Sequence, residues 1–241
     1  MGTSVVNWQE EMAKQAVAQA EKEKPNNNWL SFKSGVLSLN DTPAKDNRIL
    51  AVIFDAAYEN AWYPGAYDPK NITAPDCWAI ARDEEDLAPS NVVSEPVSPD
   101  CVNCPKNDWG SDPSGGKGKA CKNVRRIALV QASELDKGVA ANVLLARIPT
   151  MSVKNWSKYV TQIANVVRRP TWGVITELRV VPDTKSQLQV QFSFVENVPE
   201  EMLEHIAAIR EAAGDAILAE YTPNTQVEHG STVPVKGKEK F

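Results

Sequence analysis

Apolar and polar residues alternate through much of the middle of the chain, and this pattern predicts short strands. WLSFKSGVLSL, residues 29–39, has the alternation of a half-buried strand. RILAVIFDAAYENAWY, residues 48–63, predicts a buried strand that leads into a short helix or turn. RRIALVQA, residues 125–132, predicts another strand. TWGVITELRVV and QLQVQFSFV, residues 171–181 and 187–195, flank PDTKS and predict a hairpin.

The repeat of apolar residues changes to a helical period in SVKNWSKYVTQIANVVRR, residues 152–169. Ser152 is the expected cap and Pro170 the expected stop of this helix. Its apolar face contains Val153, Trp156, Val160, Ile163 and Val167. Residues 138–149, GVAANVLLARIP, fit a strand or a helix equally well.

Helix-forming composition marks both ends of this strand-rich region, so we expect an α+β protein. Residues 1–28 predict a helical arm, rich in Ala, Glu, Gln and Lys and ended by PNNN. The core then covers residues 29–198, and a last helix covers residues 199–221. Residues 222–241 have the composition of a disordered tail.

Charge is distributed unevenly, although the net charge of the whole chain is only −5. Residues 1–100 hold 8 Lys/Arg against 16 Asp/Glu, and residues 182–241 hold 5 against 10. Residues 101–181 hold 13 against 5, a net charge of +8. A basic block between acidic flanks is typical of a polyanion site, and the alternative is a chance cluster of solvated surface charge.

The four cysteines lie within 45 residues, in the order Cys77-x23-Cys101-x2-Cys104-x16-Cys121. A CxxC pair presents both thiolates to one ion, and Cys77 and Cys121 would complete a closed tetrahedral Zn²⁺ site. Two other interpretations stay open, namely reduced thiols with no ligand role and a redox-active CxxC. A redox pair usually opens a helix after a strand, whereas Pro105 continues into a loop.

The sequence shows no targeting or membrane-spanning pattern. Its first residues lack a basic start followed by an apolar block, and no apolar run approaches the roughly 20 residues of a span. We therefore expect a cytoplasmic protein, in which thiols stay reduced and a disulfide framework is disfavoured.

The loop SGGKGKA, residues 114–120, is similar to a phosphate-binding P-loop but lacks its essential residues. That motif ends in Gly-Lys-Ser/Thr at the start of a helix, whereas Gly118 follows Lys117 and Ala120 follows Lys119 here. The loop can still supply cations to phosphates, and the alternative is a solvated basic turn. The candidate cations are Lys117, Lys119, Lys122, Arg125 and Arg126.

Aromatic residues lie near these charges in a pattern that suits single-stranded nucleic acid. Bases stack on aromatic rings while cations follow the phosphates, without base-specific contacts. Trp78 and Trp156, by contrast, are expected in the core. The candidate stacking residues are Trp62, Tyr67, Trp109 and Trp172, and the last of these follows the candidate cations Arg168 and Arg169. The alternative for each of these rings is a place in the core.

Three stretches together resemble single-stranded DNA-binding proteins of tailed bacteriophages. They are YPGAYDP…PDCWAI, CVNCPKNDWGSDPSGGKGKACKNVRRIALV and WSKYVTQIANVVRRPTWGVITELRV. The resemblance covers roughly residues 30–195 and rests on the order Cys, CxxC, WGS, GKGK-x-C, basic strand. It implies a small OB-like antiparallel β-barrel with a zinc-binding loop insertion at residues 77–121, whose ligands are Cys77, Cys101, Cys104 and Cys121.

The resemblance also implies a function, which is to coat single-stranded DNA during replication or recombination and to meet the proteins of those processes in the host cytoplasm. This chain departs from the family in its basic end, VPVKGKEKF, and in its all-cysteine ligand set. No carboxylate pair, nucleophile–base set or cofactor loop indicates an enzyme. The alternative is a zinc-stapled interaction module that binds a host replication or transcription enzyme.

Overall fold

The computed structural model describes residues 8, 11, 12, 14–16, 19, 28–39, 42–65 and 73–221, which fall into two compact units. The sheet unit comprises residues 1–59 and 123–218, and the cysteine unit comprises residues 60–122 and 219–241. Most of the expected arm at residues 1–28 and all of the expected tail at residues 222–241 lie outside the described residues. Among the described residues, no helix combines the length and apolar composition needed to cross a bilayer.

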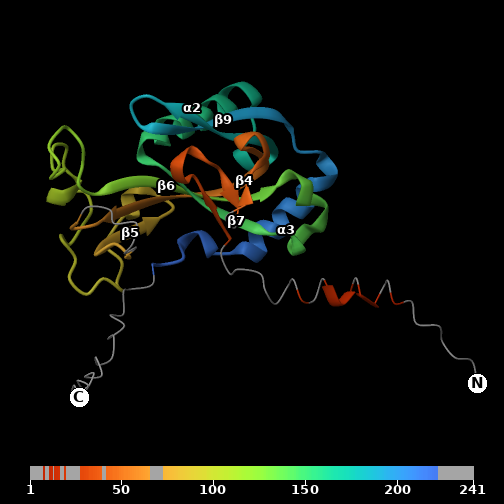
Figure 1. The fold of residues 1–241 in the computed structure, drawn as a ribbon, viewed down its shortest axis with the longest axis horizontal. Coiled ribbons are helices and arrows are strands. Elements are labelled where there is room, and N and C mark those ends of the chain that lie inside the picture. Colours follow the sequence, from red (N-terminus) through yellow and green to blue (C-terminus); the bar gives the residue numbers. More distant parts are fainter. Residues whose placement is uncertain are drawn as a thin grey trace, which may run out of the picture. The chain divides into compact units, whose positions relative to one another are not determined.

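The fold is mixed α+β, as expected, and is built on a curled sheet (Figure 1). Its strand order is β3-β2-β1-β7-β6-β4-β8-β9, and β5 pairs with β4 outside this path. β1 pairs with β7 in parallel, and the other pairs of described register are antiparallel. The strands are β1 (Trp29–Ser31), β2 (Ser38–Leu39), β3 (Thr42–Pro43), β4 (Arg48–Trp62), β5 (Cys77–Ala81), β6 (Lys122–Gln131), β7 (Val143–Ile148), β8 (Val174–Asp183) and β9 (Gln187–Asn197).

Most of the expected strands are present, with two differences. The β8–β9 hairpin is confirmed, and the ambiguous segment 138–149 contains the strand β7. β4 continues for 15 residues to Trp62, so the expected helix or turn at its end is wrong. The expected strand over residues 29–39 is divided into β1 and β2, because Ser34 and Gly35 both have positive φ, at 54° and 76°.

The expected amphipathic helix is α2 (Thr150–Gln162), which continues as a π-helix, η6 (Ile163–Val167). It begins after Pro149, so the expected cap at Ser152 is wrong. Ser152 is instead buried inside the helix, where its Oγ accepts a hydrogen bond of 2.9 Å from the backbone N–H of Val190 in β9. Asn155 donates a bond of 3.0 Å to the carbonyl of the same residue. These two bonds fix α2 on β9.

The apolar face of α2 packs on the sheet as the periodicity predicts. Trp156 and Tyr159 of α2 both contact Phe192, with ring centroids 5.3 and 5.8 Å apart. Ile163 is also buried in this cluster. The sheet contributes, among others, Ile53, Ile127, Leu129, Leu144, Ile148, Leu178 and Val190.

The last helix is shorter than residues 199–221. A 3-10 turn η8 (Glu200–Met202) precedes α3 (Leu203–Ala213), and Gly214, with φ of 49°, ends that helix before a further turn, η9 (Ala216–Leu218). α3 packs against the 3-10 segment η5 (Ala132–Ala140), and His205 Nδ1 lies 3.0 Å from the carbonyl oxygen of Leu135.

A buried ion cluster joins the central strands of the sheet unit. Arg126 of β6 and Arg147 of β7 are direct register partners, an arrangement in which like charges repel. Glu59 of β4 neutralises this repulsion, since its two carboxylate oxygens accept bonds of 2.6 Å from Arg126 Nε and 2.7 Å from Arg147 Nε. Glu59 is 1 % and Arg126 0 % exposed. Arg126 Nη1 also donates to the carbonyl of Ile217, at 2.9 Å.

We expect Glu59→Gln to lower the free energy of unfolding by about 3–5 kcal/mol, because it removes the buried carboxylate that both arginines bind. Glu177→Gln is the matched control, since Glu177 also bridges two arginines, Arg48 at 2.7 Å and Arg179 at 3.0 Å. Those arginine side chains are 44 % and 42 % exposed, so the control should lose at most about 1 kcal/mol. Urea unfolding followed by circular dichroism measures both. Equal losses in the two variants would contradict the central role of Glu59.

Candidate functional site

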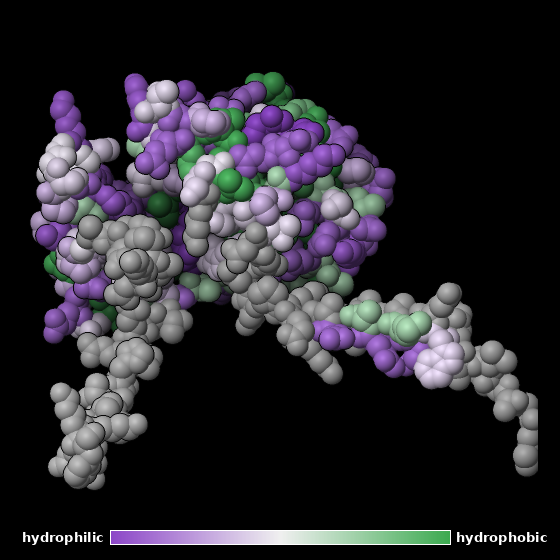
Figure 2. All heavy atoms as spheres, in the orientation of Figure 1, coloured by the Kyte–Doolittle hydropathy of each residue, from purple (hydrophilic) through white to green (hydrophobic). Residues whose placement is uncertain are grey.

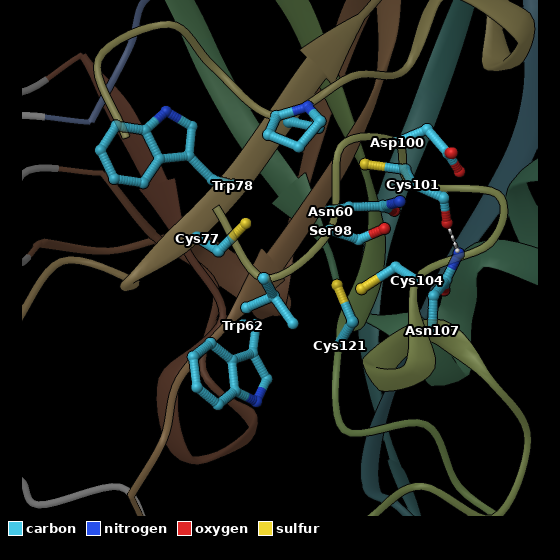
Figure 3. Close-up of a pocket in the computed structure, with 13 residues that line it drawn as sticks. Asn60, Trp62, Cys77, Trp78, Ser98, Asp100, Cys101, Cys104, Asn107 and Cys121 are labelled. Carbon is cyan, nitrogen blue, oxygen red and sulfur yellow. Dashed lines mark hydrogen bonds between the residues drawn. The ribbon is translucent and has the colours of Figure 1, made fainter. Parts of the chain in front are cut away.

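The four cysteines line one small cavity of the cysteine unit (Figure 3). Cys77 is the first residue of β5, and Cys101, Cys104 and Cys121 come from the long segment between β5 and β6. The cavity has a volume of about 20 Å³, which is room for one water molecule or one ion. Trp62, Trp78, Asn60 and Asp100 also line it.

Backbone hydrogen bonds hold the cysteine-bearing segment around this cavity. The N–H of Asn107 donates to the carbonyl of Cys104 at 2.8 Å, which forms a tight turn at η4 (Pro105–Asn107). The side-chain amide of Asn107 reaches back to the carbonyl of Cys101, also at 2.8 Å (Figure 3). The N–H of Cys121 donates to the carbonyl of Lys106 at 2.7 Å. Three of the cysteines are therefore brought together by the turn that follows the CxxC pair.

Two of the thiols, those of Cys101 and Cys121, are in an environment that keeps them neutral without a cation. Burial raises the pKa of the Cys101 thiol to about 11 and that of Cys121 to about 12. All four cysteines are free of disulfide bonds. A bound cation would reverse this preference, because metal coordination deprotonates a thiol outright.

The donor chemistry of the cavity fits Zn²⁺, but the side chains are not arranged as a finished metal site. Within residues 28–39, 42–65 and 73–221 and the few described residues before them, no group of three His, Cys, Asp or Glu side chains could hold a metal ion as it stands. Four sulfur donors around an ion-sized cavity match the ligand set of a structural zinc site. The residues that could hold the ion are Cys77, Cys101, Cys104 and Cys121.

The glycine-lysine loop between Cys104 and Cys121 has a hydrogen-bond network of its own. The N–H groups of Gly110 and Asp112 both donate to the carbonyl of Gly118, at 2.9 and 3.2 Å. A Cβ atom at Gly118 would lie 3.3 Å from Asp112 Oδ2, so glycine fits this close approach best. Hydrogen bonds from Ser114 and then Lys122 lower the pKa of Asp112 to about 2. Asp112 is thus an ionised anchor of the loop.

The loop presents an aromatic ring and cations to solvent. Trp109 is 80 % exposed, and Lys119 Nζ lies 5.3 Å from its ring centroid. Lys117 is exposed, whereas Lys122 is engaged with Asp112 at 3.1 Å. Of the candidates in this loop, Trp109 and Lys117 are thus the best placed to meet a ligand, while Lys119 is half-buried and its ammonium also donates to Asn107 Oδ1 at 3.1 Å.

A second aromatic–cation pair lies at the edge of the cavity. Trp62 is half-buried, and Lys106 Nζ lies 5.3 Å from its ring centroid. Tyr63, the next residue, is 40 % exposed. The sequence-based candidates did not include Lys106 or Tyr63, although Tyr63 directly follows Trp62 and Lys106 lies two residues after Cys104. Tyr67 lies outside the described residues.

The candidates of the sheet unit differ widely in accessibility. Arg126 is wrong as a phosphate contact, because its guanidinium is fully buried and bound to Glu59. Arg125 is half-buried and lies 3.5 Å from the ring centroid of Tyr58. Arg168 is exposed, while Arg169 is half-buried. Trp172 is half-buried, with Arg210 at 5.3 Å from its ring.

Trp78 and Trp156 are core residues, as expected, with 4 % and 6 % exposure. Trp78 also has a role that the sequence did not indicate, since its indole N–H donates to Glu220 and its ring packs edge-on against Tyr221. The segment that follows η9 is thereby attached to the cysteine unit.

No family model, curated protein or solved structure matches this chain.

Proposed function

We propose that the protein binds single-stranded DNA with little sequence preference, as a coating protein of replication or recombination in the cytoplasm rather than as an enzyme. The observation that carries this proposal is Trp109, a ring that is 80 % exposed and has a lysine ammonium beside it. A large aromatic side chain in such an exposed position contributes little to the stability of the fold. A ring with an adjacent cation can accept a stacked base while the cation meets the phosphate.

Neighbouring residues support the same chemistry. Lys106 and Trp62 repeat the aromatic–cation pairing within the cysteine unit, and Tyr63 adds a second exposed ring. Lys117 adds an exposed cation in the Trp109 loop. Phosphate contacts of this kind are independent of sequence and weaken with salt.

The curled sheet supports an OB-like reading of the sheet unit. OB folds are small, partly open Greek-key barrels that bind oligonucleotides across a sheet face and adjoining loops. The sheet of this protein is curled and mostly antiparallel, although β1 and β7 pair in parallel. The loop between β5 and β6 would be the insertion that carries the stacking residues.

We further propose that Cys77, Cys101, Cys104 and Cys121 hold one structural Zn²⁺ ion. The four sulfurs surround an ion-sized cavity, and the segment that carries them buries few apolar side chains of its own. Binding would draw the thiols closer than they stand, since metal affinity and local folding are coupled. With four thiolate ligands the site would be closed to substrate, so the ion would shape the loop and catalyse nothing.

The zinc proposal predicts about one Zn²⁺ per chain with sulfur ligands only. Cys104→Ser should release the metal and make the segment between Cys101 and Cys121 more accessible to protease, because one of four ligands is lost. Val102→Ser is the control, since it alters an exposed residue inside the same CxxC and leaves every thiol in place. Metal analysis and X-ray absorption spectroscopy measure the content and the ligands. Protein that contains no zinc after purification without chelators would contradict the assignment, as would nitrogen ligands.

The DNA-binding proposal predicts that Trp109→Ala weakens binding to oligo(dT) by about 1–3 kcal/mol, with little dependence on base identity. The melting temperature should stay unchanged, because an exposed ring contributes little to folding. Val102→Ala removes exposed apolar surface from the same unit without removing a stacking ring, so it should bind as the parent does. Fluorescence anisotropy of labelled oligonucleotides at several salt concentrations gives the affinities.

Two outcomes would contradict the DNA-binding proposal. Equal affinity for single strands and for duplex of the same length would remove the argument from stacking. Parent protein that binds neither, but captures a replication or transcription enzyme through the cysteine unit, would favour the interaction module.

A further inference from the structure

The sheet unit carries a cationic surface that the candidate site does not include. It lies on the outward side of α2 and η6, opposite the buried residues Trp156, Tyr159 and Ile163. An open hollow of about 470 Å³ follows this side. We call it the α2 face, and it is lined by Lys154, Ser157, Lys158, Thr161, Gln162, Asn165 and Val166.

The α2 face lies in a part of the chain that contains no acidic residue. Residues 138–176 include no Asp or Glu, although 31 of the 241 residues are acidic and a stretch of this length would hold about five on average. The same stretch contains five Lys or Arg. Sequence reasoning noted the wider basic block but not this complete absence of carboxylates.

The lysines of the α2 face are not used by the protein itself. Several other cations of the sheet unit have carboxylate partners, as Arg48 and Lys137 do with Glu177 and Glu134. Among the described residues, neither Lys154 nor Lys158 forms an ion pair. Both are exposed.

The polar side chains between the lysines leave donors for an anion. Ser157 and Thr161 donate their hydroxyls to carbonyls four residues earlier in the helix, at 3.1 and 2.9 Å. The ammonium groups and the amides of Gln162 and Asn165 are the donors that remain. From Lys154 to Asn165 the row is about 17 Å long at the helical rise. Lysine, glutamine and asparagine are side chains that commonly bind the phosphate backbone.

Backbone strain at the end of this row of side chains also indicates a functional surface. η6 ends at Arg168, which has a left-handed conformation with φ of 57° and donates its N–H to the carbonyl of Ile163 at 3.0 Å. Glycine or asparagine usually occupies such a helix end. An exposed arginine therefore accepts strain at a position where glycine would be relaxed. Strained residues and π-helical turns cluster at functional sites.

We infer that the α2 face, with Arg168 at its end, binds the phosphate backbone of single-stranded DNA, an inference that rests on the proposed function and gives it a second contact surface. Its lining offers cations and amide donors without a carboxylate, which suits a polyanion. A membrane is a poor match, because the apolar side of α2 is packed in the core and Met151 and Val166 are the exposed large apolar residues among the described residues of α2 and η6. The visible surface of the molecule is mostly hydrophilic, with scattered apolar patches (Figure 2).

The test is the paired variant Lys154→Gln with Lys158→Gln, which keeps side-chain length and removes two charges. Loss of two phosphate contacts should flatten the slope of log affinity against log salt by roughly 1.4 on oligo(dT). The matched control is Lys45→Gln with Lys185→Gln, which makes the same charge change on exposed lysines of the same unit outside α2. The control should keep the parent slope.

Arg168→Gly separates binding from structure. It should leave the melting temperature equal or higher, because glycine relaxes the left-handed conformation, while it weakens oligo(dT) binding several-fold. Arg168→Lys should retain most of the affinity.

The outcomes distinguish failure of the proposed DNA binding from failure of the inference about the α2 face. Parent protein that binds no oligo(dT) overturns the proposed function together with this inference. Binding that falls in Trp109→Ala but keeps its salt slope in the paired lysine variant overturns the inference alone. If the paired lysine variant loses affinity for duplex and for single strands equally, the assignment of the α2 face to single strands is overturned.

Discussion

Glu59 lies between two arginines that the sheet register places directly opposite each other, and the arrangement of the sheet unit depends on this contact. Without the carboxylate, Arg126 and Arg147 would repel each other across β6 and β7, and the fully buried Arg126 would lose its carboxylate partner. The ring of Trp29 in β1 packs on the guanidinium of Arg147, and its centroid lies 3.9 Å from the guanidinium carbon. Arg126 also bonds the carbonyl of Ile217. The Glu59 carboxylate thus links the central strands β4, β6 and β7, and the two arginines also contact β1 and η9.

This cluster explains why basic residues close together in sequence have different roles. Arg125 and Arg126 are neighbours on β6, so their side chains point to opposite faces of the sheet. Arg126 is buried in the core and paired with Glu59, while Arg125 is half-buried and packs on Tyr58. Net charge in a sequence block therefore overstates the charge available to a ligand. The exposed cations that we assign to DNA binding belong to the Trp109 loop and to the α2 face.

The cysteine unit is organised by a different constraint, the tight turn after Cys104. Its backbone bonds, together with the anchoring of the glycine-lysine loop by Asp112, place three thiols around one cavity and leave Trp109 in solvent. The loop has more internal bonding than its glycine content indicates. A metal ion would thus consolidate an existing turn rather than order a disordered chain.

The sequence by itself determined the α+β class, the hairpin of β8 and β9, the amphipathic helix α2 and the convergence of the four cysteines. These follow from local periodicity and spacing, which the residues carry without knowledge of their partners. Tertiary structure decided the rest. Periodicity could not show that β4 continues to Trp62, because its apolar run fits a strand or a strand that ends in a turn. Nor could it show that Ser152 bonds β9 or that Arg126 pairs with Glu59, since both partners are distant in sequence. Burial is set by the partner that a side chain meets, and for a buried cation that partner is a carboxylate 67 residues away.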